Sequence, residues 1–347
     1  MSRILHVSHF SWKKGVFLHG VPHKISNGLI RNGHQIINFC ARDTARSASL
    51  FGSRKLGRRH ANEMLLELCR QMEPEGIVFG HAEVIKASTL LEIRRMLPHV
   101  RIVHWNVDPL FDDSNIRQIE AVLDVVDATL ITTGGDHLRR FVRDRHKVGF
   151  LPNPTDASIE TGAAYEVQDL TFDLLYVVTN PKHVRHYCGR MWNVEELGRL
   201  IQSRLPEVSH GFFGMLGREK LVGGAFQRAL ESSKMGLNVS KRNDYYLYSS
   251  DRMAQMFGNG LLVFLDRATH LTDLIAEDMA AFHSDIEELI DKIRFFHRND
   301  ASRREVARRG AEHYHAAFNE RIVARYITDV MFDRLDRSAY PWPTLVS

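Results

Sequence analysis

Two successive runs of short apolar segments, alternating with amphipathic helical segments, constrain the fold of this 347-residue chain more than any other feature. The apolar segments have the length of strands and few charges, which is typical of strands buried on both faces of a parallel sheet. Helical segments lie between them, as parallel strands need a crossover connection. The sequence therefore predicts an α/β fold with two doubly wound parallel sheets.

The first run covers residues 4–151. It predicts strands at residues 4–8, 36–40, 76–79, 101–105, 128–132 and 148–151. A helix with Val21, Ile25 and Leu29 on one face follows the first strand, since these residues recur at the helical spacing. Asn32-Gly33 is suited to the C-terminus of that helix.

The polar, proline-containing segment from Pro152 to about Gln168 interrupts the alternation. The second run then predicts strands at residues 172–178, 211–215, 235–239 and 261–265. We accordingly expect an N-terminal domain over residues 1–160, a C-terminal domain over 170–318, and a last helix with a tail over 319–347. Ligands of such sheets bind beyond the carboxyl ends of the strands, so the residues just after each strand are the candidates for function.

Composition and charge limit the functional classes. Hydrophobic residues make up 44% and charged residues 25% of the chain, which is ordinary for a globular protein. No apolar run reaches the roughly 18 residues that would span a bilayer, and the chain starts with a strand pattern, so we expect a cytoplasmic protein. The three cysteines form no CxxC pair, which argues against a disulfide framework or a zinc knuckle. Dispersed arginines without an aromatic-basic motif predict no nucleic-acid partner.

Several short motifs in the second half carry a family resemblance. They are Gly236-Leu237-Asn238, Ser249-Ser250-Asp251-Arg252, Phe257-Gly258-Asn259-Gly260 and Phe282-His283-Ser284. With Trp105-Asn106-Val107-Asp108-Pro109 in the first half, the sequence resembles the group 1 glycosyltransferases of the GT-B fold, in particular their spore-maturation-protein-like branch. The resemblance implies two Rossmann-like domains whose sheets face each other across a cleft. It also implies a nucleotide-sugar co-substrate on the C-terminal domain, no further cofactor, and a last helix that crosses back to the first domain.

The expected donor site lies at the start of the helix near residue 250. A helix N-terminus exposes unpaired N–H groups and a positive dipole end, which suits a diphosphate. Ser249, Ser250 and Arg252 would add donors there, although simple N-capping by Ser250 is the alternative. Gln255 stands where many relatives have the glutamate that binds the donor ribose. This departure leaves the donor nucleotide open.

Four further cations are candidates for the donor phosphates because they follow strands of the second domain. They are Lys182, Arg185, Arg218 and Lys220. Charge on a departing phosphate must be stabilised in a metal-independent glycosyl transfer, and these side chains are suited to that role. For each of them a solvated surface position is the competing interpretation.

His81 and Asp108 follow strands of the first domain and are the candidate catalytic residues. Either side chain could accept the proton of an acceptor hydroxyl as general base if the transfer inverts the anomeric centre. A transfer with retention needs no such base. Asp108 precedes a proline and could equally be a turn residue.

The acceptor side of the first domain is expected to include His19, His23, Gly134 and Gly135. The histidines are four residues apart, but no third ligand accompanies them, so we expect no metal site. The glycine pair would let the backbone approach a ligand closely, or would simply form a turn.

Arg139, Arg140 and Arg143 belong to the densest basic run of the chain. A solvated helix face is one interpretation of this run. The other is peripheral contact with an anionic glycan or with an anionic membrane surface at its inner face.

The sequence thus predicts a glycosyltransferase that moves a hexosyl or related group from a nucleotide sugar to a hydroxyl of a glycan or lipid-linked acceptor. Surface polysaccharide or glycoconjugate synthesis is the expected setting. A non-catalytic GT-B-like protein that binds a nucleotide or glycan is the alternative, motivated by Gln255. A sugar epimerase or a phosphorylase is a third hypothesis, without a signature of its own in the sequence.

Overall fold

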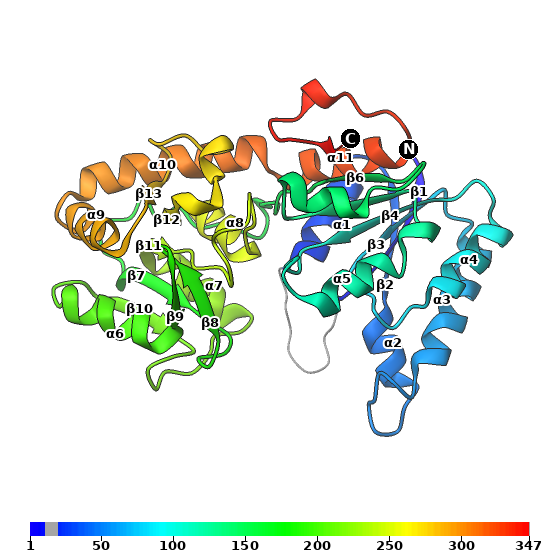
Figure 1. Ribbon diagram of the computed structural model, residues 1–347, viewed down its shortest axis with the longest axis horizontal. Helices are drawn as coiled ribbons and strands as arrows, with labels where there is room; N and C mark the ends of the chain where they lie inside the picture. The colour runs from blue at the N-terminus through cyan, green and yellow to red at the C-terminus, as the bar shows by residue number, and fades with distance from the viewer. Residues whose placement is uncertain (11–19, 347) are drawn as a thin grey trace. The chain divides into compact units, whose positions relative to one another are not determined.

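The computed structural model describes residues 1–10 and 20–346, which form two compact units (Figure 1). Unit 1 comprises Met1–Pro152 and Glu320–Ser347, and unit 2 comprises Asn153–Asn319. Residues 153–160, which the sequence placed in the first domain, pack within unit 2. The Asn153 amide donates to Ser249 Oγ over 3.1 Å, and Thr155 N donates to Phe318 O over 3.0 Å.

Unit 1 contains a seven-stranded sheet. In spatial order its strands are β14 (Leu345–Val346), β6 (Lys147–Phe150), β5 (Ala128–Ile131), β4 (Arg101–Asn106), β3 (Gly76–Phe79), β1 (Arg3–Ser8) and β2 (Gln35–Cys40). Strands β1–β6 are parallel and correspond to the six strands predicted for the first run, whereas β14 pairs antiparallel with β6.

Helices cover both faces of this sheet. Helices α2 (Ala41–Ser47), α3 (Arg58–Met72) and α4 (Ala87–Met96) share one apolar core with β1, β3 and β4. Helices α1 (Val21–Arg31) and α11 (Glu320–Met331) pack against each other, and α11 also contacts β4 and β5. Helix α5 (Asp113–Glu120) and the short 3-10 helices Leu123–Val125, Gly135–Phe141 and Arg337–Ala339 complete the unit.

The close approach of α1 and α11 depends on Gly28. A Cβ atom at this position would lie 2.0 Å from the carbonyl oxygen of Glu320, so a larger residue does not fit. Arg31, one turn further along α1, forms an ion pair of 2.5 Å with the Glu320 carboxylate. The last helix of the chain is therefore an integral part of unit 1.

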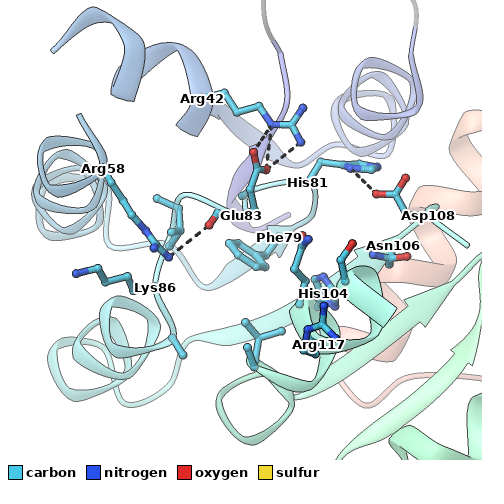
Figure 2. Close-up of a pocket in the computed structure, with 17 residues that line it drawn as sticks. Arg42, Arg58, Phe79, His81, Glu83, Lys86, His104, Asn106, Asp108 and Arg117 are labelled. Atoms are coloured by element: carbon cyan, nitrogen blue, oxygen red, sulfur yellow. Dashed lines mark hydrogen bonds and ion pairs between the residues drawn. The ribbon is translucent and has the colours of Figure 1, made fainter. Parts of the chain in front are cut away.

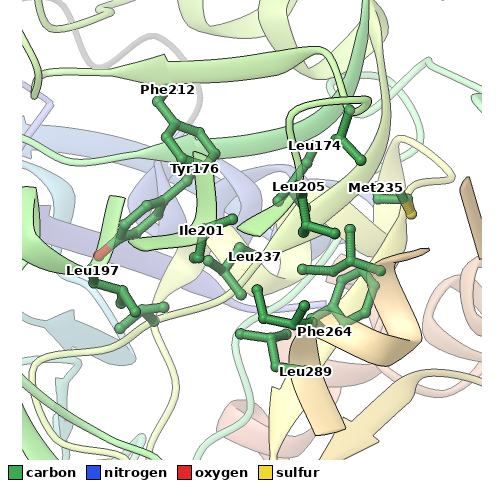
Figure 3. Close-up of a cluster of buried hydrophobic side chains, with 14 of the residues drawn as sticks. Leu174, Tyr176, Leu197, Ile201, Leu205, Phe212, Met235, Leu237, Phe264 and Leu289 are labelled. Carbon is green, nitrogen blue, oxygen red and sulfur yellow. The ribbon is translucent and has the colours of Figure 1, made fainter. Parts of the chain in front are cut away.

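Unit 2 contains a five-stranded parallel sheet. In spatial order its strands are β10 (His210–Phe213), β7 (Phe172–Val177), β11 (Ser233–Leu237), β12 (Leu262–Asp266) and β13 (Ala281–His283). Its helices are α6 (Val194–Arg204), α7 (Gly224–Glu231), α8 (Asp251–Gly258), α9 (Ile286–Arg298) and α10 (Asp300–Ala317), and two short 3-10 helices cover Arg267–Thr269 and Leu271–Asp273. Figure 3 shows the core in which β7, β11 and β12 pack against α6 and α9, with Tyr176, Ile201, Leu237, Phe264 and Leu289.

A small antiparallel hairpin of β8 (Val184–Tyr187) and β9 (Arg190–Asn193) is inserted between β7 and α6. This hairpin was not predicted from the sequence. The hairpin folds onto the loop after β11, where the Asn243 amide donates to the carbonyl oxygen of His186 over 2.6 Å. It thereby carries Arg185 into the interior of unit 2, where only 4% of the residue stays exposed.

Candidate active site

The two sheets share one strand order, which locates a candidate site in each unit. In both sheets the first strand lies between the second and the third of the sheet, as β1 lies between β2 and β3, and β7 between β10 and β11. The second strand therefore lies on one side of the first, and the third strand lies on the other side. Ligands of such sheets bind at the carboxyl ends of the strands at this switch point, which is β1 and β3 in unit 1 and β7 and β11 in unit 2.

In unit 1 the two candidate catalytic residues meet beside the switch point, where β3 and β4 end (Figure 2). His81 Nδ1 lies 3.5 Å from Asp108 Oδ2. Burial lowers the pKa of His81 below its ordinary value, while the Asp108 charge opposes this shift. The imidazole is therefore neutral at pH 7, with a carboxylate beside Nδ1.

The backbone around His81 has little freedom. His81 has φ of 50°, in the left-handed region, and its ring lies edge-on to Trp105 at 5.2 Å between centroids. A Cβ at the preceding Gly80 would lie 2.3 Å from Trp105 Cε2, so only glycine fits there. A sparsely populated backbone conformation, such as that of His81, occurs at functional sites as well as in tight turns.

Asn115 of α5, which the sequence did not single out, holds the loop that carries Asp108. Its amide exchanges two hydrogen bonds with Asn106, of 2.7 and 3.1 Å. It also donates to the carbonyl oxygens of Asp108 and Pro109 over 3.0 and 3.1 Å. The buried amide pair therefore fixes the backbone of the loop that carries Asp108.

His81 and Asp108 border a pocket of about 400 Å³ at the ends of β3 and β4. Its other polar lining residues include Arg42, Arg58, Glu83, Lys86, His104 and Arg117. The Glu83 carboxylate is compensated by Arg42 at 2.9 Å and by Arg54. His104 is buried, which lowers its pKa to about 3, and its Nδ1 has no partner among the described residues. The pocket can thus hold a polar ligand against a neutral imidazole.

In unit 2 the switch point is occupied by two arginines. Arg252, in the first turn of α8, donates to the carbonyl oxygens of Val177 and Val239 at the ends of β7 and β11. Burial and the nearby charge of Arg185 lower the pKa of Arg252 to about 10. Among the described residues, neither arginine has an Asp or Glu within ion-pair distance. Two neighbouring guanidinium groups without a carboxylate favour an anionic ligand.

Several buried polar atoms around these arginines also lack a partner within the part of the chain that the structure describes. They are Arg185 Nε, Tyr176 Oη, Asn238 Oδ1, Ser240 Oγ and Ser250 Oγ. Ser250 is the N-cap residue of α8, yet its side chain forms no cap hydrogen bond. Because buried polar groups are ordinarily paired, these atoms are available to form hydrogen bonds with a ligand or with water.

The other candidate donor residues are placed differently. Ser249 is buried and engaged by Asn153, so its hydroxyl has a structural role. Gln255 is half-buried in α8, whereas Lys182 and Lys220 are exposed. The guanidinium of Arg218 donates to the carbonyl of His210, the first residue of β10. The expectation that Arg218 joins the carboxyl-end site does not hold, because the turn after β10 directs its side chain back along that edge strand.

The acceptor-side candidates are only partly described. His19 lies outside the described residues, and His23 in α1 packs edge-on to Phe10 at 5.3 Å. Gly134 and Gly135 begin a 3-10 helix, and Gly135 has φ of 70°, which favours glycine. Within residues 1–10 and 20–346 there is no group of three or more His, Cys, Asp or Glu side chains that could hold a metal ion. In the same ranges, no helix has the length and apolar character to cross a membrane.

Solved structures show which fold this is. Sucrose-phosphate synthase from Thermosynechococcus elongatus is similar with a TM-score of 0.66 and 12% identity, over 95% of this chain and 98% of that chain. An alpha-glucosyltransferase in complex with UDP is similar with a TM-score of 0.64 and 10% identity, over 95% of this chain and 100% of that chain. The HepE protein of Anabaena in complex with UDP and glucose is similar with a TM-score of 0.57 and 10% identity, over 96% of this chain and 100% of that chain. The chain has the GT-B fold of these glycosyltransferases.

A family model adds to this fold assignment. Residues 188–329 match the family described as glycosyl transferase-like. No curated protein matches the sequence. The matched segment contains α8 and most of the polar groups of the unit 2 site. The family match and the fold together support a glycosyltransferase.

Proposed function

We propose that the protein transfers a sugar from a nucleotide-sugar donor, bound by unit 2, to a hydroxyl group of an acceptor bound by unit 1. One observation carries the proposal: Arg185 and Arg252 lie at the carboxyl ends of β7 and β11 without a carboxylate partner, next to the N-terminus of α8. A diphosphate matches this arrangement in charge and in hydrogen-bonding capacity. That relatives of the same fold bind UDP supports the choice of ligand.

In this proposal the arginines stabilise the leaving group. As the bond between the sugar and the phosphate breaks, negative charge grows on the departing diphosphate. Arg185 Nε and the N–H groups at the start of α8 would bind that charge. Arg252 is already held by Val177 and Val239, so it would contribute its positive charge without reorganising. The transfer needs no metal ion for this step, and activity should persist in a chelator.

His81 and Asp108 would act on the acceptor. Asp108 faces Nδ1 of His81, so it can orient the ring and stabilise the imidazolium ion, while Nε2 accepts the proton of the acceptor hydroxyl. This role applies to a transfer with inversion. With retention, the pair would instead bind the acceptor by hydrogen bonds.

The acceptor class is proposed from the same pocket. A glycan or lipid-linked glycan fits a polar pocket of about 400 Å³ lined by histidine, asparagine and arginine side chains. Synthesis of a surface polysaccharide or glycoconjugate in the cytoplasm is the setting that this acceptor implies. We also propose the spore-maturation-protein-like branch, on the motifs between residues 236 and 284 together with the segment of residues 105–109.

A panel of nucleotide sugars tests the proposal. We expect one donor to release its nucleotide in the presence of a glycan acceptor mixture and to raise the melting temperature without acceptor. If no donor is turned over and no nucleotide stabilises the protein, the proposal is wrong. Nucleotide binding without turnover on any acceptor would favour a non-catalytic binding protein.

A further inference from the structure

The loop that joins α2 to α3, residues 48–57, carries three of the most exposed large apolar side chains in the described chain (Figure 1, blue). Leu50 is fully exposed, and Phe51 and Leu56 are exposed by 85% and 69%. Single exposed apolar residues are common on protein surfaces, but a cluster of them marks an interaction site.

Hydrogen bonds and close packing hold the 48–57 loop in a defined conformation. Gly52 N donates to Ser49 O over 2.9 Å and Ser53 N to Ser49 Oγ over 3.2 Å, which closes a turn around Leu50 and Phe51. At the other end, a Cβ at Gly57 would lie 1.7 Å from Ala45 O, so the glycine lets the loop pack against α2. The turn therefore holds both apolar side chains outward.

The surface around this loop is basic. Residues 44–62 contain Arg46, Arg54, Lys55, Arg58 and Arg59 and no Asp or Glu. With Arg42 there are six cations, against the three carboxylates that pair with them: Asp43, Glu63 and Glu83. Lys55 has no ion pair with a described residue, and Arg58 donates only to the carbonyl oxygens of Val84 and Glu83. A net positive charge thus surrounds the apolar tip.

An apolar tip within a basic surface matches an anionic lipid interface in both of its components. The apolar side chains can enter the boundary between headgroups and acyl chains, while the cations attract the headgroups. A nucleic acid would account for the cations but not for Leu50 and Leu56, since its stacking partners are aromatic. We propose that the 48–57 loop and its basic surround dock unit 1 on an anionic membrane surface.

Docking at this loop would place the candidate pocket at the lipid surface. Arg54 of the loop pairs with Glu83, and Glu83 and Arg58 both line the pocket. A lipid-linked acceptor could then enter the pocket from the membrane. This last point rests on the proposed function, whereas the docking itself does not.

The basic run around Arg139 does not offer the same surface. Arg139 pairs with Asp136 at 2.9 Å, and Arg143 donates to the carbonyl oxygens of Arg140 and Val142. None of the exposed large apolar side chains of the described chain lies within residues 136–146. Two arginines of this run are therefore ion-paired, Arg139 with Asp136 and Arg140 with Glu120, and the run has no exposed large apolar side chain that could enter the lipid.

Cosedimentation of the full chain with vesicles tests the docking. We expect binding to vesicles of equal parts phosphatidylcholine and phosphatidylglycerol, weakening with salt, and little binding to phosphatidylcholine alone. The double variant Leu50→Ser/Phe51→Ser should bind at least about tenfold more weakly. Lys55→Glu/Arg59→Glu should bind more weakly by a similar factor, because about 1 kcal/mol per cation converts to several-fold.

Matched variants keep the test specific. Phe295→Ser, at another exposed apolar residue, and Arg139→Glu/Arg140→Glu should leave vesicle binding unchanged. Circular dichroism and the melting temperature check that each variant is folded. Nucleotide binding by unit 2 is measured in parallel, so a failure of the proposed donor site is seen separately from a failure of docking.

Four results would overturn the docking proposal. They are no binding of the wild type to anionic vesicles, unchanged binding by Leu50→Ser/Phe51→Ser, binding to duplex DNA in place of vesicles, and a dimer in lipid-free solution that the same substitutions dissociate.

Discussion

Units 1 and 2 share a strand order but differ in the chemistry at their switch points. In unit 1 the ends of β3 and β4, beside the switch point, carry histidines, a carboxylate and a compensated glutamate. In unit 2 the ends of β7 and β11 carry two arginines and unpaired hydroxyl and amide groups, without a carboxylate on either arginine among the described residues. One topology thus supplies a site suited to proton transfer and another suited to an anion. The topology alone determines where the sites lie, and the side chains determine what each can bind.

Substitution of the unit 1 pair should have the largest effect on activity. If transfer inverts the anomeric centre, His81→Asn should lower kcat by about 10²–10⁴, with nucleotide binding by unit 2 unchanged. Asp108→Asn removes the charge that raises the pKa of His81, so the acid limb of the pH–rate profile should move to lower pH. An unchanged kcat in His81→Asn would show that His81 is not the general base.

Arg185→Ala should have the next largest effect and should act on unit 2 alone. Loss of a preorganised donor to the leaving group should lower kcat/KM by about 10²–10³ and weaken binding of the nucleoside diphosphate. Arg199→Ala is the control, because Arg199 is exposed and pairs only with Glu195 on the same helix. Isothermal titration calorimetry measures the affinity of each variant for the nucleotide. Equal affinities of both variants would show that Arg185 does not bind the donor.

Acid should destabilise unit 1 more than unit 2. Burial lowers the pKa of His6 and of His104 to about 3, whereas in the unfolded chain each would have an ordinary value. Below pH 6.5 the unfolded chain therefore binds protons that the fold cannot, so stability is present above pH 6.5 and is lost as pH falls toward 3. The loss should be about 2 kcal/mol per histidine at pH 5.

Unit 2 contains one comparable histidine, His283, with a pKa lowered to about 4. Peptide-resolved hydrogen exchange at pH 7 and pH 5, corrected for the intrinsic rates, measures both units in one sample. His104→Leu should reduce the pH dependence of unit 1. An equal loss of stability in both units, or none, would contradict the prediction.

Gly28→Ala should have the smallest effect of the four, confined to the packing of α1 on α11. The added methyl group would collide with the Glu320 backbone, and such overpacking costs about 1–3 kcal/mol. Gly20→Ala is the control, since among the described residues its Cβ would meet only Pro22, at 3.5 Å. Thermal unfolding should show a lower melting temperature for Gly28→Ala alone.

All strands of the two sheets except β13 and β14 were predictable, because each is an apolar run of strand length between amphipathic helices. Strands β13 and β14 were not predicted, since they have only three and two residues. The proximity of His81 and Asp108 could be predicted, because each residue follows a strand at the same edge of the sheet. Asn115 could not be identified, since its role depends on Asn106 and on a loop that turns back toward it. Arg185 was predicted as a candidate for the donor phosphates, with a solvated surface position as the alternative. Its burial by the β8–β9 hairpin, through contacts with residues near 243, was not predicted. Such long-range placement leaves no local pattern in the sequence.

A crystal structure with the bound nucleoside diphosphate of the active donor tests the central claim most directly. The diphosphate should lie in unit 2, within hydrogen-bond distance of Arg185 Nε and of the N–H groups at the start of α8, with Ser250 Oγ and Tyr176 Oη beside it. A diphosphate bound in the pocket of unit 1, or one that leaves Arg185 and the α8 N-terminus untouched, would contradict it.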